Sequence, residues 1–163
     1  MPLIKNGEFA EDTYANVADD APMPANGSIV SIARFRKDRE ELLTRNAPLG
    51  VRLPSSESPE TLGEDVHRLS VIALEFPRFR DGRGFSWARM LRTRLGFIGE
   101  IRATGPYLYD QIAFMRRVGI DAFEVPEGFA LEDYRRAVGE MSFVYQPSVD
   151  GRKTIRELRA QPQ

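Results

Sequence analysis

Residues 69–76 form a nearly continuous apolar run, and this run constrains the fold more than any other stretch of the chain. A strand with one solvated face alternates polar and apolar side chains, so an unbroken run of this length indicates a strand covered on both faces. An arginine- and glycine-rich loop follows at 77–84, and a helical pattern begins at Phe85. In α/β proteins, a junction of this kind is where ligands usually bind.

The same order of strand, loop and helix recurs along the sequence, which predicts an α/β fold. Repeated βα units build a mainly parallel sheet with right-handed crossovers, either an open three-layer sheet or a partial barrel. The expected strands are 28–35, 49–53, 69–76, 99–104, 122–125 and 142–145, and the expected helices are 38–45, one starting at 58, 85–95, 107–118 and 131–141.

The N-terminal residues predict a short β-hairpin. Asn6-Gly7 separates two short extended segments, and this dipeptide is a strong signal for a tight hairpin turn. A further extended piece is expected at 13–17. We therefore divide the chain into an N-terminal hairpin and connecting loop, residues 1–27, an α/β domain, residues 28–145, and a C-terminal tail, residues 146–163, that is loose or docks late.

The composition excludes several kinds of chemistry. The chain has no cysteine, which rules out thiolate metal sites, iron–sulfur ligation through thiolates and cysteine catalysis. With His67 as the only histidine, a multi-histidine metal site is impossible, and we expect no metal. No dinucleotide fingerprint is present, so the identity of any cofactor stays unknown. We expect a cytoplasmic protein with no membrane partner, because no apolar run reaches the length of a signal peptide or a membrane span.

The charge is unevenly distributed. The net charge of −1 argues against nucleic acid as a partner. Between Arg68 and Arg117, however, ten arginines face four carboxylates. Guanidinium groups bind carboxylate, phosphate and sulfur oxyanions in a forked geometry, so a small anionic ligand or an acidic protein surface is a reasonable partner. The alternative is a solvated helix face with structural ion pairs.

The loop and helix start at 81–86, Asp-Gly-Arg-Gly-Phe-Ser, could bind an anion through backbone donors and the helix N-terminus. It is not a Gly-x-Gly-x-x-Gly motif, because Trp87 replaces the third glycine, and it is not a P-loop. The alternative is a glycine turn in which Asp81 or Ser86 caps the helix. The candidate anion- or partner-binding residues are Arg78, Arg80, Gly82, Arg83, Gly84, Ser86 and Arg102.

Charged residues also lie near the ends of three expected strands. Glu75, Arg102 and Glu124 would lie side by side if these strands are neighbours. Such a row could orient a substrate, with Glu75 or Glu124 as the catalytic acid–base residue. The alternative is that these charges simply pair with one another.

Several spaced motifs resemble a bacterial family known as domain of unknown function 934. They lie at 74–86, 91–92, 99–105, 110–111 and 119–124. Members of that family are commonly labelled as oxidoreductases of sulfite reduction, because their genes lie beside those for sulfite reductase and sulfur assimilation. The resemblance supplies no catalytic residues.

The resemblance implies a role in sulfur assimilation. Sulfite reduction uses sirohaem and an iron–sulfur cluster, which a cysteine-free chain cannot ligate through thiolates, so this is not the catalytic subunit. We expect an accessory protein of assimilatory sulfite reduction whose arginines dock sulfite reductase or its electron donor, or hold a sulfur oxyanion. The alternative is a small enzyme, an oxidoreductase acting on an anionic metabolite. A third possibility is that the loops are structural and the function lies in an oligomeric interface.

Overall fold

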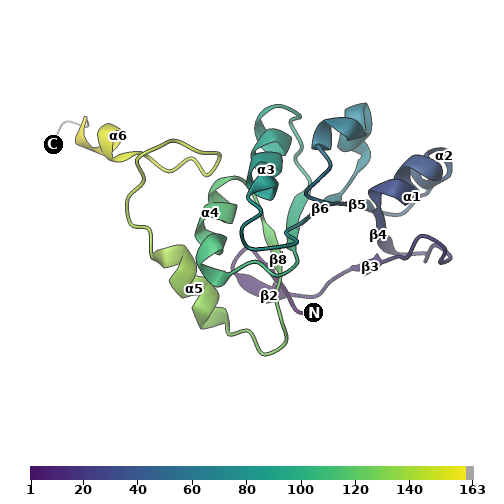
Figure 1. Ribbon diagram of the computed structural model, residues 1–163, viewed down its shortest axis with the longest axis horizontal. Helices are drawn as coiled ribbons and strands as arrows, with labels where there is room; N and C mark the ends of the chain where they lie inside the picture. The colour runs from purple at the N-terminus through teal and green to yellow at the C-terminus, as the bar shows by residue number, and fades with distance from the viewer. Residues whose placement is uncertain (161–163) are drawn as a thin grey trace.

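The computed structural model describes residues 1–160 and contains one eight-stranded sheet (Figure 1). The strand order is β2-β1-β8-β7-β6-β5-β4-β3; β3 to β8 run parallel, and β1 is antiparallel to both of its neighbours. This confirms the predicted parallel sheet and N-terminal hairpin. The strands are β1 (Leu3–Lys5), β2 (Glu8–Ala10), β3 (Tyr14–Asn16), β4 (Gly27–Ser31), β5 (Leu49–Leu53), β6 (Val71–Glu75), β7 (Glu100–Thr104) and β8 (Ala122–Glu124).

The helices between residues 32 and 139 lie in an arc along the convex side of the sheet, which curls into a half-barrel (Figure 1). Of the two predicted architectures, the partial barrel is therefore the observed one. Val30, Val51, Ile72 and Ile101 pair in register across β4 to β7 and form the core beneath the helices. The helices are α1 (Ile32–Lys37), α2 (Arg39–Thr44), the 3₁₀ segment η1 (Pro59–Arg68), α3 (Arg83–Thr93), the 3₁₀ turn η2 (Tyr109–Gln111), α4 (Ile112–Arg117), α5 (Leu131–Gly139) and α6 (Ile155–Arg159).

The concave side of the sheet is covered by the chain itself. Residues 11–13 connect β2 and β3, which are the two edge strands, so this short link crosses the open side of the half-barrel (Figure 1). Tyr14 at its end packs against Ile29, Val71 and Ala73. As a result, β6 is buried on both faces, which explains the unbroken apolar run in its sequence.

Two predicted strands differ from the structure. The strand expected at 28–35 ends at Ser31, because the Ser31 hydroxyl accepts a hydrogen bond from the Arg34 backbone N–H at 3.0 Å and starts α1. The prediction of a strand at 142–145 was wrong. Only Val144 pairs there, in an isolated bridge to Thr154.

Residues 146–150 of the C-terminal segment dock on Arg117 of α4, and α6, which follows them, lies away from the sheet (Figure 1). The Thr154 hydroxyl and the Glu157 carboxylate form a capping box at the start of that helix, a signal that the sequence prediction missed. The last three residues of the predicted tail, 161–163, lie outside the described residues. Among the helices of residues 1–160, none combines the length and the apolar character needed to cross a bilayer.

Candidate functional site

At the carboxyl ends of the strands, residues of β5 to β8 and of the loops that follow β6 and β7 line an open hollow of about 280 Å³. We call this hollow the mouth pocket. Glu75 and Glu124 both line it, so the structure brings the two predicted catalytic carboxylates into one pocket. The lining residues are Arg52, Glu75, Phe76, Pro77, Thr104, Gly105, Pro106 and Glu124.

A second, largely apolar hollow of about 390 Å³ adjoins the mouth pocket and shares Gly105, Pro106 and Glu124 with it. Tyr107 lines this second hollow, and its hydroxyl donates a hydrogen bond to the Glu124 carbonyl at 2.5 Å. Burial raises the pKa of Tyr107 well above its usual range, so the hydroxyl stays a neutral donor. This bond fixes the backbone at the point where the two hollows meet.

Close packing around Phe76 shapes the rim of the mouth pocket. The ring is buried, and a Cβ placed on Gly84 would lie 2.5 Å from it. A Cβ on Gly105, which has φ of +101°, would lie 2.5 Å from the Phe76 carbonyl oxygen. Gly84, one of the predicted binding residues, is therefore required for packing whatever else it does.

The predicted row of Glu75, Arg102 and Glu124 lies on three adjacent strands, but its ion pairs are uneven. Arg102 Nη1 lies 3.5 Å from Glu124 Oε1. Glu75 pairs instead with Arg52, whose Nε lies 3.8 Å from Glu75 Oε1. In the register of the sheet, Glu75 pairs with Thr104, and Arg102 lies two residues earlier on β7 and does not line the mouth pocket. The structure therefore places Glu75 and Glu124 together at the strand ends, with Arg52 as the added charge.

Arg102 is the centre of an ion cluster on the concave face and is only 1% exposed. Its guanidinium donates to both carboxylate oxygens of Asp12, at 2.7 and 3.0 Å, and to Glu100 Oε1 at 2.8 Å. Lys5 adds a second cation, 2.8 Å from Glu100 Oε2. We call Lys5, Asp12, Glu100, Arg102 and Glu124 the inner ion cluster.

The ionisation of the inner ion cluster follows from these contacts. Burial opposes the charge on Arg102, but its hydrogen bonds to Asp12 and its interaction with Glu100 raise the pKa of Arg102. Burial likewise opposes the charge on Asp12, yet the hydrogen bonds from Arg102 hold the pKa of Asp12 below its usual value. The positive charge of Arg102 is therefore balanced by carboxylates inside the protein, where an external partner does not reach it.

The positive charge of Arg83 is also balanced, by the carboxylate of Asp81, two residues earlier in the chain. Its guanidinium donates to Asp81 Oδ1 at 2.9 Å and to Asp81 Oδ2 at 2.6 Å, and the Ser55 hydroxyl donates to Oδ2 at 2.8 Å. These bonds hold the pKa of Asp81 well below its usual range. Asp81 Oδ1 also accepts the Arg83 backbone N–H at 3.2 Å. The N-cap of α3 is Gly82, without a side-chain capping bond, so Asp81 bonds the first N–H of the helix from the position before the cap. Gly82 and Ser86 are exposed beside it.

Arg78 and Arg80 differ from the other two predicted arginines. Both are exposed in the loop after β6, and within residues 1–160 neither forms an ion pair. The Arg80 guanidinium lies 5.3 Å from the ring centroid of Phe79, which is 50% exposed. The Gln111 amide donates to the Phe79 carbonyl at 2.9 Å and holds the loop against η2. We call Arg78, Phe79 and Arg80 the RFR tip.

Sequence reasoning missed several residues of this region. Arg52 could have been found, because the alternation Val51-Arg52-Leu53 in a strand places it on the face opposite the core. Thr104 and Tyr107 carry no motif that marks them. Asp12 lies in a loop 90 residues from Arg102, and nothing local indicates that contact.

Together these features define an α/β half-barrel with a polar pocket at the carboxyl ends of its strands and an exposed basic tip beside it. The chain belongs to the family described as "Bacterial protein of unknown function (DUF934)", whose sequence model matches residues 50–156. The match runs from β5 into α6 and confirms the resemblance found in the motifs. Among curated proteins, none matches the chain.

Proposed function

We propose that the protein is an accessory protein of assimilatory sulfite reduction, acting in the cytoplasm, and that it docks an acidic surface of sulfite reductase or its electron donor through the RFR tip. The observation that carries this proposal is the exposure of Arg78 and Arg80, without ion pairs among the described residues, on either side of a half-exposed Phe79. The link to sulfite reduction comes from the family resemblance.

The RFR tip has the chemistry of a docking contact. Arginine and aromatic side chains are enriched at the centres of protein interfaces, where a few residues supply most of the binding energy. Each guanidinium can bind a carboxylate in a forked geometry, and Phe79 offers an apolar surface between them. Arg83 and Arg102 are already satisfied by internal carboxylates, so the proposal depends on Arg78 and Arg80.

The double substitution Arg78→Ala and Arg80→Ala is expected to weaken binding to the partner by about 30- to 700-fold, because each truncated interface arginine costs on the order of 1–2 kcal/mol and the double variant loses both. The partner is identified first by affinity purification from native cells grown on sulfate as sole sulfur source. Affinity is then measured by surface plasmon resonance at several salt concentrations, and it should fall as salt rises.

Arg135→Ala is the matched control, because Arg135 is an exposed arginine on α5 with only a 3.9 Å pair to Glu132. It should bind the partner like the wild type. Affinity that is independent of salt, or equal in the double variant and the control, would contradict docking through the RFR tip.

A small enzyme is the second candidate function, because Glu75 and Glu124 line the same pocket together with Arg52. Arg52 could hold an anionic metabolite while one glutamate moves a proton. An oxidoreductase reaction there would need a cofactor whose identity is unknown.

The variants Glu75→Gln and Glu124→Gln separate the two candidates, because glutamine keeps the shape of the side chain and removes its acid–base chemistry. Under the accessory proposal, each variant should restore growth of a deletion strain on sulfate as well as the wild type does. The control is Glu127→Gln, which changes an exposed glutamate outside the pocket. If a folded Glu75 or Glu124 variant fails while the control succeeds, the enzyme interpretation replaces docking.

A further inference from the structure

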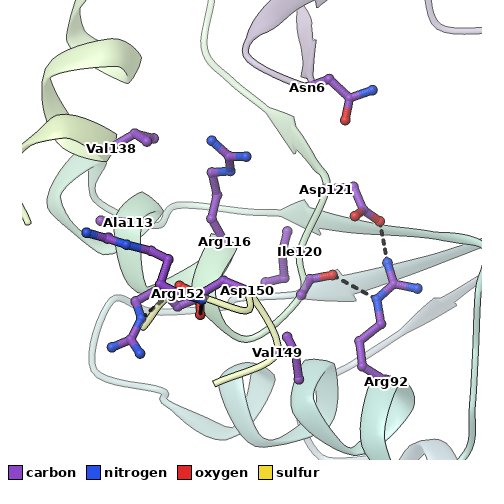
Figure 2. Close-up of a pocket in the computed structure, with 12 residues that line it drawn as sticks. Asn6, Arg92, Ala113, Arg116, Ile120, Asp121, Val138, Val149, Asp150 and Arg152 are labelled. Carbon is purple, nitrogen blue, oxygen red and sulfur yellow. Dashed lines mark hydrogen bonds and ion pairs between the residues drawn. The ribbon is translucent and has the colours of Figure 1, made fainter. Parts of the chain in front are cut away.

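A larger cavity lies at the opposite end of the sheet from the mouth pocket. It has a volume of about 620 Å³. It lies at the start of β8, beside the turn that joins β1 to β2 (Figure 2). We call it the basal cavity. Its lining residues are Asn6, Arg92, Ala113, Arg116, Arg117, Gly119, Ile120, Asp121, Val138, Val149, Asp150 and Arg152.

The C-terminal segment supplies one wall of the basal cavity and is fastened there by Arg117. The Arg117 guanidinium donates to Asp150 Oδ2 at 3.1 Å and to the Gln146 carbonyl at 2.6 Å. The Ser148 hydroxyl donates back to the Arg117 carbonyl at 2.6 Å. Val149, Asp150 and Arg152 therefore enclose the space from the side of the tail.

The two aspartates of the basal cavity form ion pairs with two of its four arginines. Arg117 pairs with Asp150. Arg92 pairs with Asp121, and its guanidinium also donates to the carbonyls of Phe97, Gly99 and Gly119. These two arginines are structural, since they hold loops together and their charges are balanced.

The other two arginines, Arg116 and Arg152, have no carboxylate partner among residues 1–160. Arg152 donates through Nη2 to the carbonyls of Met141 and Ser142, which leaves its charge uncompensated. Arg116 is an exposed residue whose side chain rises from α4 into the space between Val138 and Asn6 (Figure 2). The basal cavity therefore carries an excess of two positive charges.

A buried hydroxyl lies close to Arg116. Tyr134 on α5 is only 2% exposed, and the Arg116 guanidinium lies beside its hydroxyl. Burial raises the pKa of Tyr134, and nearby Arg116 offsets part of that rise. Tyr134 does not line the basal cavity itself, so Arg116 is the residue that joins this hydroxyl to the cavity.

The remaining walls of the basal cavity are apolar. Ala113, Ile120, Val138 and Val149 line it together with the charged residues. Pockets of several hundred Å³ that combine apolar walls with a few convergent polar groups are typical of small-molecule sites. We propose that the basal cavity binds a small organic anion, a molecule with a tetrahedral phosphate or sulfate group and a compact apolar part, and that Arg116 binds the oxyanion.

Calorimetric titration of the full chain with phenyl phosphate and with phenyl sulfate tests this proposal and separates the two oxyanions. We expect at least one of them to bind, and phenol, which lacks the oxyanion, to bind at least about tenfold more weakly. Arg116→Ala should weaken binding about tenfold or more, and Arg116→Lys should weaken it less, because lysine keeps the charge and loses the fork. Hydrogen exchange in residues 146–152 should slow when the probe binds.

Arg135→Ala is the control for surface charge, and thermal unfolding of each variant confirms that it is folded. Arg78→Ala with Arg80→Ala should leave probe binding unchanged, so a failure of this proposal is distinguishable from a failure of docking at the RFR tip. The proposal is overturned if neither probe binds at millimolar concentration, if phenol binds equally well, or if folded Arg116→Ala binds both probes like the wild type.

Discussion

Replacement of Arg102 by methionine is expected to lower the free energy of unfolding by about 3–5 kcal/mol, the usual loss when one partner of a buried ion pair is removed. Arg102 is 1% exposed and donates to Asp12 and Glu100. Methionine can fill much of the volume, but it leaves these carboxylates and that of Glu124 facing one another. Lys5 remains as the one other cation of the inner ion cluster.

The measurement is urea unfolding followed by the fluorescence of Trp87, the only tryptophan of the chain. Arg102→Lys should lose less stability, because it keeps the charge but cannot bind Asp12 through a fork. Arg89→Met on the exposed surface of α3 is the matched control and should change the free energy of unfolding by less than about 0.5 kcal/mol. A loss below about 1 kcal/mol for Arg102→Met would contradict a stabilising role for the inner ion cluster.

The pH dependence of this loss has a definite sign. The pKa of Asp12 is lowered in the folded protein, so its ionic contribution is present above its unfolded pKa of about 4 and is lost as the pH falls toward the lower folded value. The difference in unfolding free energy between wild type and Arg102→Met should therefore be steady above about pH 5 and shrink below about pH 4. A difference that stays constant into acid would mean that packing, rather than charge, dominates at this position.

The inner ion cluster also shows where reasoning from sequence ends. The strands at 49–53, 71–75 and 100–104 were predictable, because hydrophobic periodicity is a local signal and each strand carries it. The contact between Asp12 and Arg102 joins residues 90 positions apart through a link that crosses the concave face. It depends on how far the sheet curls, which no single segment encodes.

The residues of the candidate sites were also predictable only in part. Glu75 and Glu124 could be placed near one another, because the carboxyl ends of neighbouring parallel strands share an edge. The arginines could not be separated into free and paired groups, because the sequence does not show that Arg83 folds back onto Asp81 while Arg78 stays exposed. The basal cavity was missed altogether, since its walls come from five separate segments, including the tail.

Gly105→Ala is expected to lower the free energy of unfolding by about 2–4 kcal/mol, from backbone strain of about 1 kcal/mol and overpacking of about 1–3 kcal/mol. Gly105 has φ of +101°, which disfavours any residue with a Cβ. That Cβ would also lie 2.5 Å from the Phe76 carbonyl oxygen, a backbone atom that cannot rotate away. The Phe76 backbone N–H donates to the Thr104 carbonyl at 2.8 Å, so a shift of Phe76 would also disturb β7.

Gly128→Ala separates strain from collision. Gly128 also has positive φ, +78°, but nothing lies within 4 Å of its added Cβ, so this control should lose only about 1 kcal/mol. Urea unfolding of both variants gives the difference, which measures the contact between Gly105 and Phe76. Equal losses in the two variants would show that the backbone at Phe76 can shift away from the added Cβ without lowering the free energy of unfolding. A larger loss at Gly105 would show that the wall of the mouth pocket is rigid, as a pocket that positions Glu75 and Glu124 requires.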